Sequence, residues 1–274
     1  MTEKQNKLEQ HFERYQSILR DLTLMSDVLM RNVLKKKECA EYVLRTILNR
    51  KDLTVTDVTV QQDHKNLHGR SAILDCVAAD TEGSRYDIEV QQGNGGASPK
   101  RARYHSGMLD ANTLKPGEDF DSLPDSYVIF ITEEDVLRGG LQKYQVERKV
   151  KETGKRFNDH SHIIYVNTAI QDDTELGRLI HDFHCRNADE MYSETLAEQI
   201  RNIKETEKGV TDMCQEMEKI YEEGIEQGIE RGIEKGIERM VLNALQNRSA
   251  REVSEMLKLP LEQVLNIERQ MPAQ

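Results

Sequence analysis

The sequence contains few of the residues that build disulfide or zinc frameworks. Its 274 residues include only four cysteines, five prolines and no tryptophan. The cysteines (Cys39, Cys76, Cys185 and Cys214) are scattered and form no C-x-x-C spacing. A disulfide scaffold or a zinc knuckle is therefore not expected, and a reducing cytoplasm is the predicted compartment.

Long apolar runs are also missing. No run approaches the ~20 residues that a helix needs to cross a bilayer. The first residues, M-T-E-K-Q-N-K-L-E-Q-H, lack the apolar core of a signal peptide. These absences predict a cytoplasmic protein without a membrane partner.

An excess of positive charge is missing as well, because the net charge is −11. Most of the acidity belongs to the C-terminal part. Residues 187–274 contain 11 Lys and Arg against 19 Asp and Glu, whereas residues 1–186 contain 27 against 30. The first 186 residues are nearly balanced, so a locally basic cleft for a polyanion is compatible with this sequence.

The pattern of apolar residues predicts a mixed α/β domain that ends in helices. Residues 21–50 have helical periodicity on both sides of Lys35–Lys37, and 174–222 are helical and highly charged. Ser98-Pro99 has the composition of a helix start and predicts a helix to about residue 110. Strands are predicted for residues 53–61, 72–79, 85–91, 126–132 and 161–167.

The strongest chemical pattern lies on two of these predicted strands. If residues 72–79 and 85–91 pair as a hairpin with 80–84 as its loop, Asp75 faces Glu89. Period two then places Gln91 on the same face as Glu89. Opposed like charges destabilise a sheet, and a divalent cation bound between them removes that penalty.

Spacing alone leaves an alternative open, namely an edge hairpin with a solvated acidic face. The metal hypothesis also depends on register. A slip of one residue would place Asp75 and Glu89 on opposite faces of the sheet and remove the site.

The segment D-(13 residues)-E-V-Q, followed by K-R-A-R-Y-H-S, resembles the PD-(D/E)XK nuclease superfamily. More narrowly, the chain is similar to the bacterial Rpn-type recombination-promoting nucleases and putative transposases. The similarity covers roughly residues 21–270. It includes the segments at 22–30 (L-T-L-M-S-D-V-L-M), 99–106 (P-K-R-A-R-Y-H-S), 117–131 (G-E-D-F-D-S-L-P-D-S-Y-V-I-F-I), 161–168 (S-H-I-I-Y-V-N-T) and 172–183 (D-D-T-E-L-G-R-L-I-H-D-F).

The resemblance implies roles for individual residues. Asp75 and Glu89 would bind the metal, Mg²⁺ with Mn²⁺ or Ca²⁺ as alternatives. Glu41 would be the supporting acid, against the alternative of a solvated helix position. Gln91 takes the place of the superfamily's lysine, and it can orient a water molecule but carries no charge. Leu74 stands where the motif has proline.

The basic helix after the glycine run Gly93–Gly96 provides the candidate phosphate contacts. Lys100, Arg101 and Arg103 would hold the DNA backbone, with Arg103 the first choice and Tyr104 beside it. A solvated helix face with Tyr104 in the core is the alternative.

Histidine and cysteine offer a weaker pattern. His181 and His184 have an i, i+3 spacing but no carboxylate partners in pattern, so a zinc site is not predicted there. Cys185 is interpreted as a packed side chain rather than a nucleophile.

Residues 224–239 repeat one tetrapeptide four times: G-I-E-Q, G-I-E-R, G-I-E-K and G-I-E-R. Interior glycines cost a helix about 1 kcal/mol each relative to alanine. Close approach of a second helix would offset this cost, so a homo-oligomer through residues 224–240 is one hypothesis and a frayed spacer is the other. The end piece contains a capping box, Ser249-x-x-Glu252.

Together these features predict a restriction-endonuclease-like mixed sheet flanked by helices, with an all-helical C-terminal extension. The expected function is Mg²⁺-dependent cleavage of DNA, linked to recombination or mobile elements. A DNA-binding relic without turnover and an oligomerisation module are the rival functions. The predicted divisions are a tail (1–20), a nuclease-like core (21–186), a helical extension (187–223), the repeat (224–240) and a helical hairpin (241–274).

Overall fold

The computed structural model describes residues 3–64, 72–93 and 96–269. The chain forms two units, Met1–Thr211 and Asp212–Gln274, which are described separately. In the described part of the chain, no helix is long and apolar enough to cross a membrane. The four cysteines are buried and free.

The first unit is built on a six-stranded mixed sheet with the order β1-β2-β3-β4-β6-β5. Strands β3, β4 and β6 are parallel to one another, and the other neighbouring pairs are antiparallel. The strands are β1 (Val55–His64), β2 (Ala72–Asp80), β3 (Arg85–Gln91), β4 (Ser126–Thr132), β5 (Lys143–Val146) and β6 (Ser161–Asn167).

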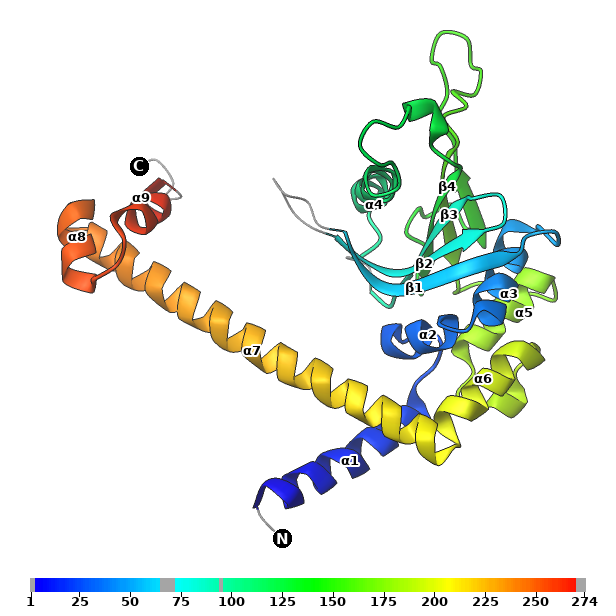
Figure 1. The fold of residues 1–274 in the computed structure, drawn as a ribbon, viewed down its shortest axis with the longest axis horizontal. Coiled ribbons are helices and arrows are strands. Elements are labelled where there is room, and N and C mark those ends of the chain that lie inside the picture. Colours follow the sequence, from blue (N-terminus) through cyan, green and yellow to red (C-terminus); the bar gives the residue numbers. More distant parts are fainter. Residues whose placement is uncertain (1–2, 65–71, 94–95, 270–274) are drawn as a thin grey trace. The chain divides into compact units, whose positions relative to one another are not determined.

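Helices cover both faces of this sheet (Figure 1). The helix α4 (Pro99–Ala111) connects the parallel strands β3 and β4 and packs on one face. The opposite face is covered by helices that include α2 (Asp27–Leu34) and α3 (Lys37–Leu48). Because both faces are covered, the central strand β4 is a continuous apolar run, with residues 128–131 fully buried.

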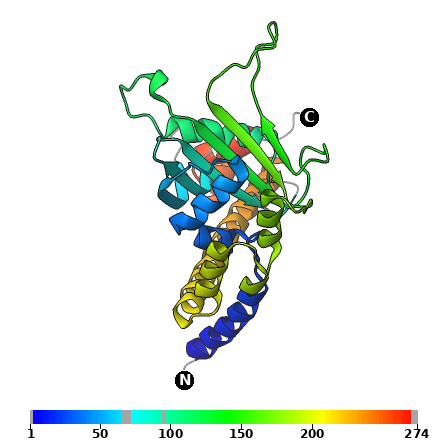
Figure 2. The same ribbon diagram turned by 90° about the vertical axis from the view of Figure 1, so that its right-hand side faces the viewer.

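The remaining elements of the first unit are helical. They are α1 (Glu3–Asp21), α5 (Glu175–His184), α6 (Glu194–Lys204) and two 3-10 turns, η1 (Phe120–Ser122) and η2 (Ala188–Glu190). Residues 3–20 of the predicted tail (1–20) therefore lie in a helix. The loop 147–160 projects beyond the sheet between β5 and β6 (Figures 1 and 2).

The helix α7 (Glu207–Leu245) continues from the first unit into the second, which also contains α8 (Ala250–Leu257) and α9 (Leu261–Arg269). Val241, Val253 and Val264 form its small core. Ser249 and Glu252 exchange hydrogen bonds as a capping box, as the sequence predicted.

The structure confirms the predicted mixed α/β fold with a helical C-terminal region. The predicted strands and the helix start at Ser98 are present, and the Ser98 side chain accepts a hydrogen bond from the Arg101 N–H. The strand β5 was not predicted because four residues at a sheet edge are too few to establish an alternating pattern. Within the glycine run, residues 94–95 lie outside the described residues.

Candidate active site

The register of the β2–β3 hairpin decides the position of the two predicted metal-binding acids. The ladder ends at the pair Cys76–Ile88, and continuing this register by one residue puts Asp75 opposite Glu89. The backbone N–H of Asp75 donates to Glu89 Oε1 at 3.0 Å. The Glu89 side chain therefore reaches β2 itself, and the two residues are in direct contact.

Two side chains of the helix α4 converge on the same face of β3. His105 Nδ1 lies 3.0 Å from Asp87 Oδ2 and 3.6 Å from Glu89 Oε1. Asp87, Glu89 and His105 each offer one ligand atom, and these atoms lie within 4.8 Å of one another. Asp87 and Glu89 are fully buried, and Asp87 Oδ1 has no hydrogen-bond partner among the described residues.

The cation nearest to this acidic cluster is Arg101. Its Nη2 lies 3.0 Å from Glu89 Oε2, and its Nη1 donates to the Gly96 carbonyl oxygen at 2.9 Å. Its guanidinium lies 5.9 Å from the centre of the Phe130 ring, and its Nε lies 3.2 Å from His105 Nε2. Arg101 is thus held at four points beside Glu89.

Because several acids lie close together away from solvent, their pKa values are raised. Desolvation, followed by the charge of Glu89, raises the pKa of Asp75 to about 7. Desolvation and Asp87 raise the pKa of Glu89 to about 7, although His105 and Arg101 act against this rise. Burial also raises the pKa of Asp87 and lowers that of His105. A cluster of this kind is stabilised by a bound cation.

Gln91 lies at the end of β3, next to the glycine loop. A Cβ built on Gly96 would collide with Gln91 Oε1 and lie 2.6 Å from its Cδ. The Gln91 amide therefore rests directly on the Gly96 backbone, in space that only glycine leaves open.

The other residues of the predicted basic helix are exposed. Lys100, Arg103 and Tyr104 are at the surface of α4, with Tyr104 37 % exposed. They can meet a ligand from solvent, whereas Arg101 is the basic residue of this helix that contacts the acids.

Glu41 is not brought to the acidic cluster. Its Oε2 accepts the Val55 N–H at 2.9 Å, and its Oε1 lies 2.9 Å from Arg45 Nη2. Val55 pairs with Asp80, five residues along β2 from Asp75, which corresponds to roughly 16 Å at ~3.3 Å per residue. Glu41 secures the start of β1 in this structure, far from Asp75.

Sequence reasoning missed Asp87 and His105, and also the pair Asp27–Arg31 on α2. The charges of Asp27 and Arg31 act on Asp75, after burial and Glu89, with Asp27 raising its pKa and Arg31 lowering it. Arg31 is 6 % exposed, and its Nε lies 3.3 Å from Asp27 Oδ1. The available signals were the alternation Asp87-x-Glu89 and the i, i+4 spacing of Arg101 and His105.

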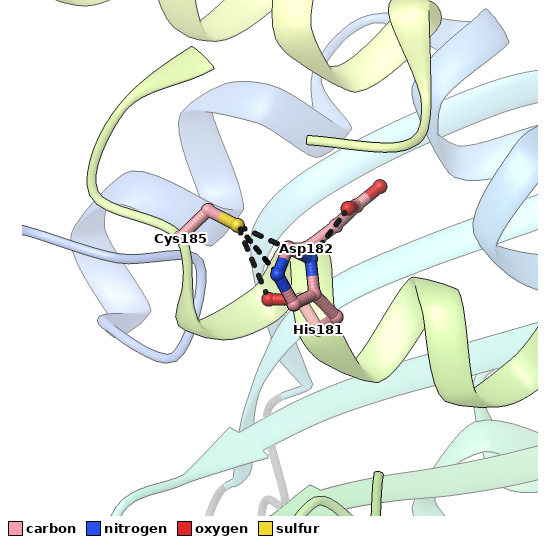
Figure 3. A group of neighbouring side chains, drawn as sticks. All are labelled: His181, Asp182 and Cys185. Carbon is pink, nitrogen blue, oxygen red and sulfur yellow. Dashed lines mark hydrogen bonds and ion pairs between the residues drawn. The ribbon is translucent and has the colours of Figure 1, made fainter. Parts of the chain in front are cut away.

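A second cluster lies at the end of α5, where His181, Asp182 and Cys185 approach one another (Figure 3). Asp182 already accepts hydrogen bonds from the Tyr192 and Ser193 N–H groups, which fixes the start of α6. The Cys185 sulfur lies 3.4 Å and 3.9 Å from the two ring nitrogens of His181, so it does not lie along either nitrogen lone pair.

The chemistry of this second cluster also favours packing. Burial, together with Asp182, raises the pKa of the Cys185 thiol to about 11, so the thiol is protonated at neutral pH. His184, the other histidine singled out from the sequence, is not one of these three side chains.

Comparison with known families matched residues 35–223 to the PD-(D/E)XK nuclease family transposases. The chain belongs to this family. The match spans all six strands and α4, and it begins after Asp27 and Arg31. Comparisons with curated proteins and with solved structures found no match.

Nucleases of the PD-(D/E)XK family generally use divalent metal ions, and the site of this chain fits such an ion. Its donors are the carboxylate oxygens that hard cations prefer. Asp87 Oδ1 is buried and has no hydrogen-bond partner in the described ranges. The pKa values of Asp75 and Glu89 are raised. Both features indicate negative charge that the described contacts do not fully compensate.

Proposed function

We propose that this protein is a metal-dependent DNA endonuclease that acts in recombination or on mobile elements. The observation that carries the proposal is the hydrogen bond from the Asp75 backbone N–H to the Glu89 carboxylate on the adjacent strand, beside the buried acid Asp87. Membership of a nuclease family supplies the class of reaction, the hydrolysis of a phosphodiester bond.

Asp75 and Glu89 would hold the ion, Mg²⁺ or alternatively Mn²⁺ or Ca²⁺. Such an ion polarises a phosphoryl oxygen and lowers the pKa of a bound water. His105, hydrogen-bonded to Asp87, lies 3.6 Å from Glu89 Oε1 and would support the position of this ligand from the protein side. Gln91 would orient the attacking water, and the exposed Lys100 and Arg103, with Tyr104, would contact the DNA backbone.

The test is nicking of supercoiled plasmid with Mg²⁺ or Mn²⁺ by the wild type, Asp75→Asn and Glu89→Gln. We expect the wild type to cut and both variants to lose at least about 10²-fold in rate, because each removes one ligand charge. Asp57→Asn, an exposed acid on β1, is the matched control and should cut as the wild type does.

The same assay separates the rival functions. DNA binding without metal-dependent cutting would identify a relic of the fold. Absence of both would identify an interaction module. Equal cutting by the wild type and both acid variants would show that the metal is held elsewhere.

We also propose that residues 224–240 join copies of this chain. Ile225, Ile229 and Ile233 are 45 %, 59 % and 59 % exposed on α7. A Cβ added at Gly224, Gly228, Gly232 or Gly236 meets no described atom within 4 Å. Residues spaced by four form a ridge inclined to the helix axis, and two such ridges interlock at about −50°.

Light scattering over a range of concentrations tests this oligomer. The wild type should be larger than a monomer, and Gly228→Leu/Gly232→Leu should dissociate it because the leucines prevent close approach. Glu230→Ala, which keeps every glycine, is the control. A monomeric wild type would contradict the proposal, as would an unchanged oligomer in the double leucine variant.

A further inference from the structure

Gln91 stands where the wider PD-(D/E)XK superfamily, which this chain resembles, has a lysine, and its side chain carries no charge. We infer that Arg101 of α4 supplies the positive charge that such a lysine would carry, while Gln91 orients the water. Gly96 positions both side chains, because Arg101 donates to its carbonyl oxygen and the Gln91 amide packs against its backbone. This inference rests on the proposed function and assigns residues within it.

The position of Gln91 is set by the loop after β3. Its amide occupies the space in which any side chain at position 96 would lie. Gly96 does not adopt a positive φ, so it is needed here for space and not for an unusual backbone conformation. Gln91 thereby keeps an amide that can hold a water molecule, without a charge of its own.

The position of Arg101 is set by the same glycine. Its Nη1 donates to the Gly96 carbonyl oxygen, and its Nη2 pairs with Glu89 Oε2. The Phe130 ring lies beneath the guanidinium at 5.9 Å. Arg101 is 37 % exposed at its side chain, so one side of the guanidinium remains open to an anion from solvent.

A cation at this point has two opposite effects. It offsets negative charge that develops on a phosphate beside Glu89, which assists cleavage. It also opposes a metal ion at Glu89, because it repels that ion and competes for Oε2. A residue that only supports the fold would weaken both functions together when removed.

The first experiment measures these two effects separately in Arg101→Gln. We expect cleavage to fall by about 10²-fold, whereas Mn²⁺ binding measured by calorimetry tightens about fivefold, the equivalent of 1 kcal/mol of repulsion. Arg103→Gln, an exposed arginine two residues further along α4, should leave the Mn²⁺ affinity unchanged. Weaker or equal Mn²⁺ binding by Arg101→Gln would overturn the inference.

The second experiment moves the charge back to position 91. The double variant Gln91→Lys/Arg101→Gln should regain at least about tenfold in cleavage over Arg101→Gln, a coupling that independent sites do not show. If the loss of cleavage in the double variant equals the sum of the losses, in free energy, of Gln91→Lys and Arg101→Gln, the proposed division of roles between these residues is wrong.

The third experiment tests whether Gly96 positions Gln91. Gly96→Ala should reduce cleavage about tenfold or more in the wild type by displacing Gln91, yet have no further effect in a Gln91→Ala background. Gly107→Ala is the control, since a Cβ there meets no described atom within 4 Å. A further loss in the Gln91→Ala background would show that Gly96 does not act through Gln91.

The results also distinguish this inference from the proposed function. If the wild type binds Mn²⁺ but does not cut DNA, the endonuclease proposal is wrong. The Mn²⁺ affinity of Arg101→Gln, compared with that of the wild type, would still decide whether the charge of Arg101 acts on the ion. A wild type that binds no Mn²⁺ would overturn both.

Discussion

At the scale of single residues, Asp75 combines a cost to folding with a proposed role in binding a metal. Its side chain is half-buried beside Glu89, and no described contact pairs it with a cation as Arg101 is paired with Glu89. Active sites commonly keep such unfavourable groups because function requires them.

This arrangement predicts an unusual dependence of stability on pH. Burial and Glu89 raise the pKa of Asp75 from 3.8 to about 7. Between these values the native state binds more protons than the unfolded state, so the contribution of Asp75 to the free energy of unfolding falls as pH rises from about 4 to about 7. In metal-free buffer, Asp75→Asn should be the more stable form at pH 8, by on the order of 2 kcal/mol.

Thermal unfolding of both proteins in chelator at pH 8 and pH 5 measures this difference. The advantage of Asp75→Asn should narrow at pH 5, where Asp75 of the wild type is protonated. If Asp75→Asn is less stable than the wild type at pH 8, the negative charge of Asp75 is stabilised by other groups in the folded protein.

At the scale of elements, the site depends on the turn that sets the β2–β3 register. Asp80 Oδ1 accepts the N–H groups of Glu82 and Ser84, both at 2.9 Å, and Asp80 Oδ2 accepts the Tyr86 hydroxyl at 2.6 Å. A buried carboxylate with three donors fixes the turn, and the turn fixes which residue faces Glu89.

Asp80→Ala should therefore be destabilising, by about 2–4 kcal/mol, because it leaves two buried donors without their acceptor. Denaturant unfolding measures the change. Glu82→Ala, at an exposed position of the same turn, should change stability by less than about 0.5 kcal/mol. A small effect of Asp80→Ala would show that strand packing alone sets the register.

The helix α4 shows how far element prediction reaches. Its start at Ser98-Pro99 follows from local capping chemistry, so the sequence predicts it well. Which of its basic residues meets the acids depends on the rotation of the helix over the sheet. The structure turns Arg101 and His105 toward β3, and Arg103, the first choice for a phosphate contact, lies at the surface.

At the scale of the whole molecule, a bound metal should stabilise the fold, because the ion would bind the native arrangement of Asp75 and Glu89 and not the unfolded chain. Linkage predicts about 2.7 kcal/mol at a concentration of 100 times Kd. Addition of Mn²⁺ should raise the melting temperature of the wild type and leave that of Asp75→Asn/Glu89→Gln nearly unchanged. Equal shifts in both proteins would place the ion outside this site.

The sequence by itself determined the mixed α/β fold, the approximate positions of five of the six strands and the family, because these depend on alternation, capping and local motifs that persist along the chain. It also put Asp75 opposite Glu89 through the length of one hairpin loop. Only the tertiary structure turned Glu41 away toward Val55 and brought His105, Arg101 and Gly96 to the acids. Those contacts join separate helices and strands. The relative orientation of these elements depends on packing between distant segments of the chain, so it cannot be read from a short stretch of sequence.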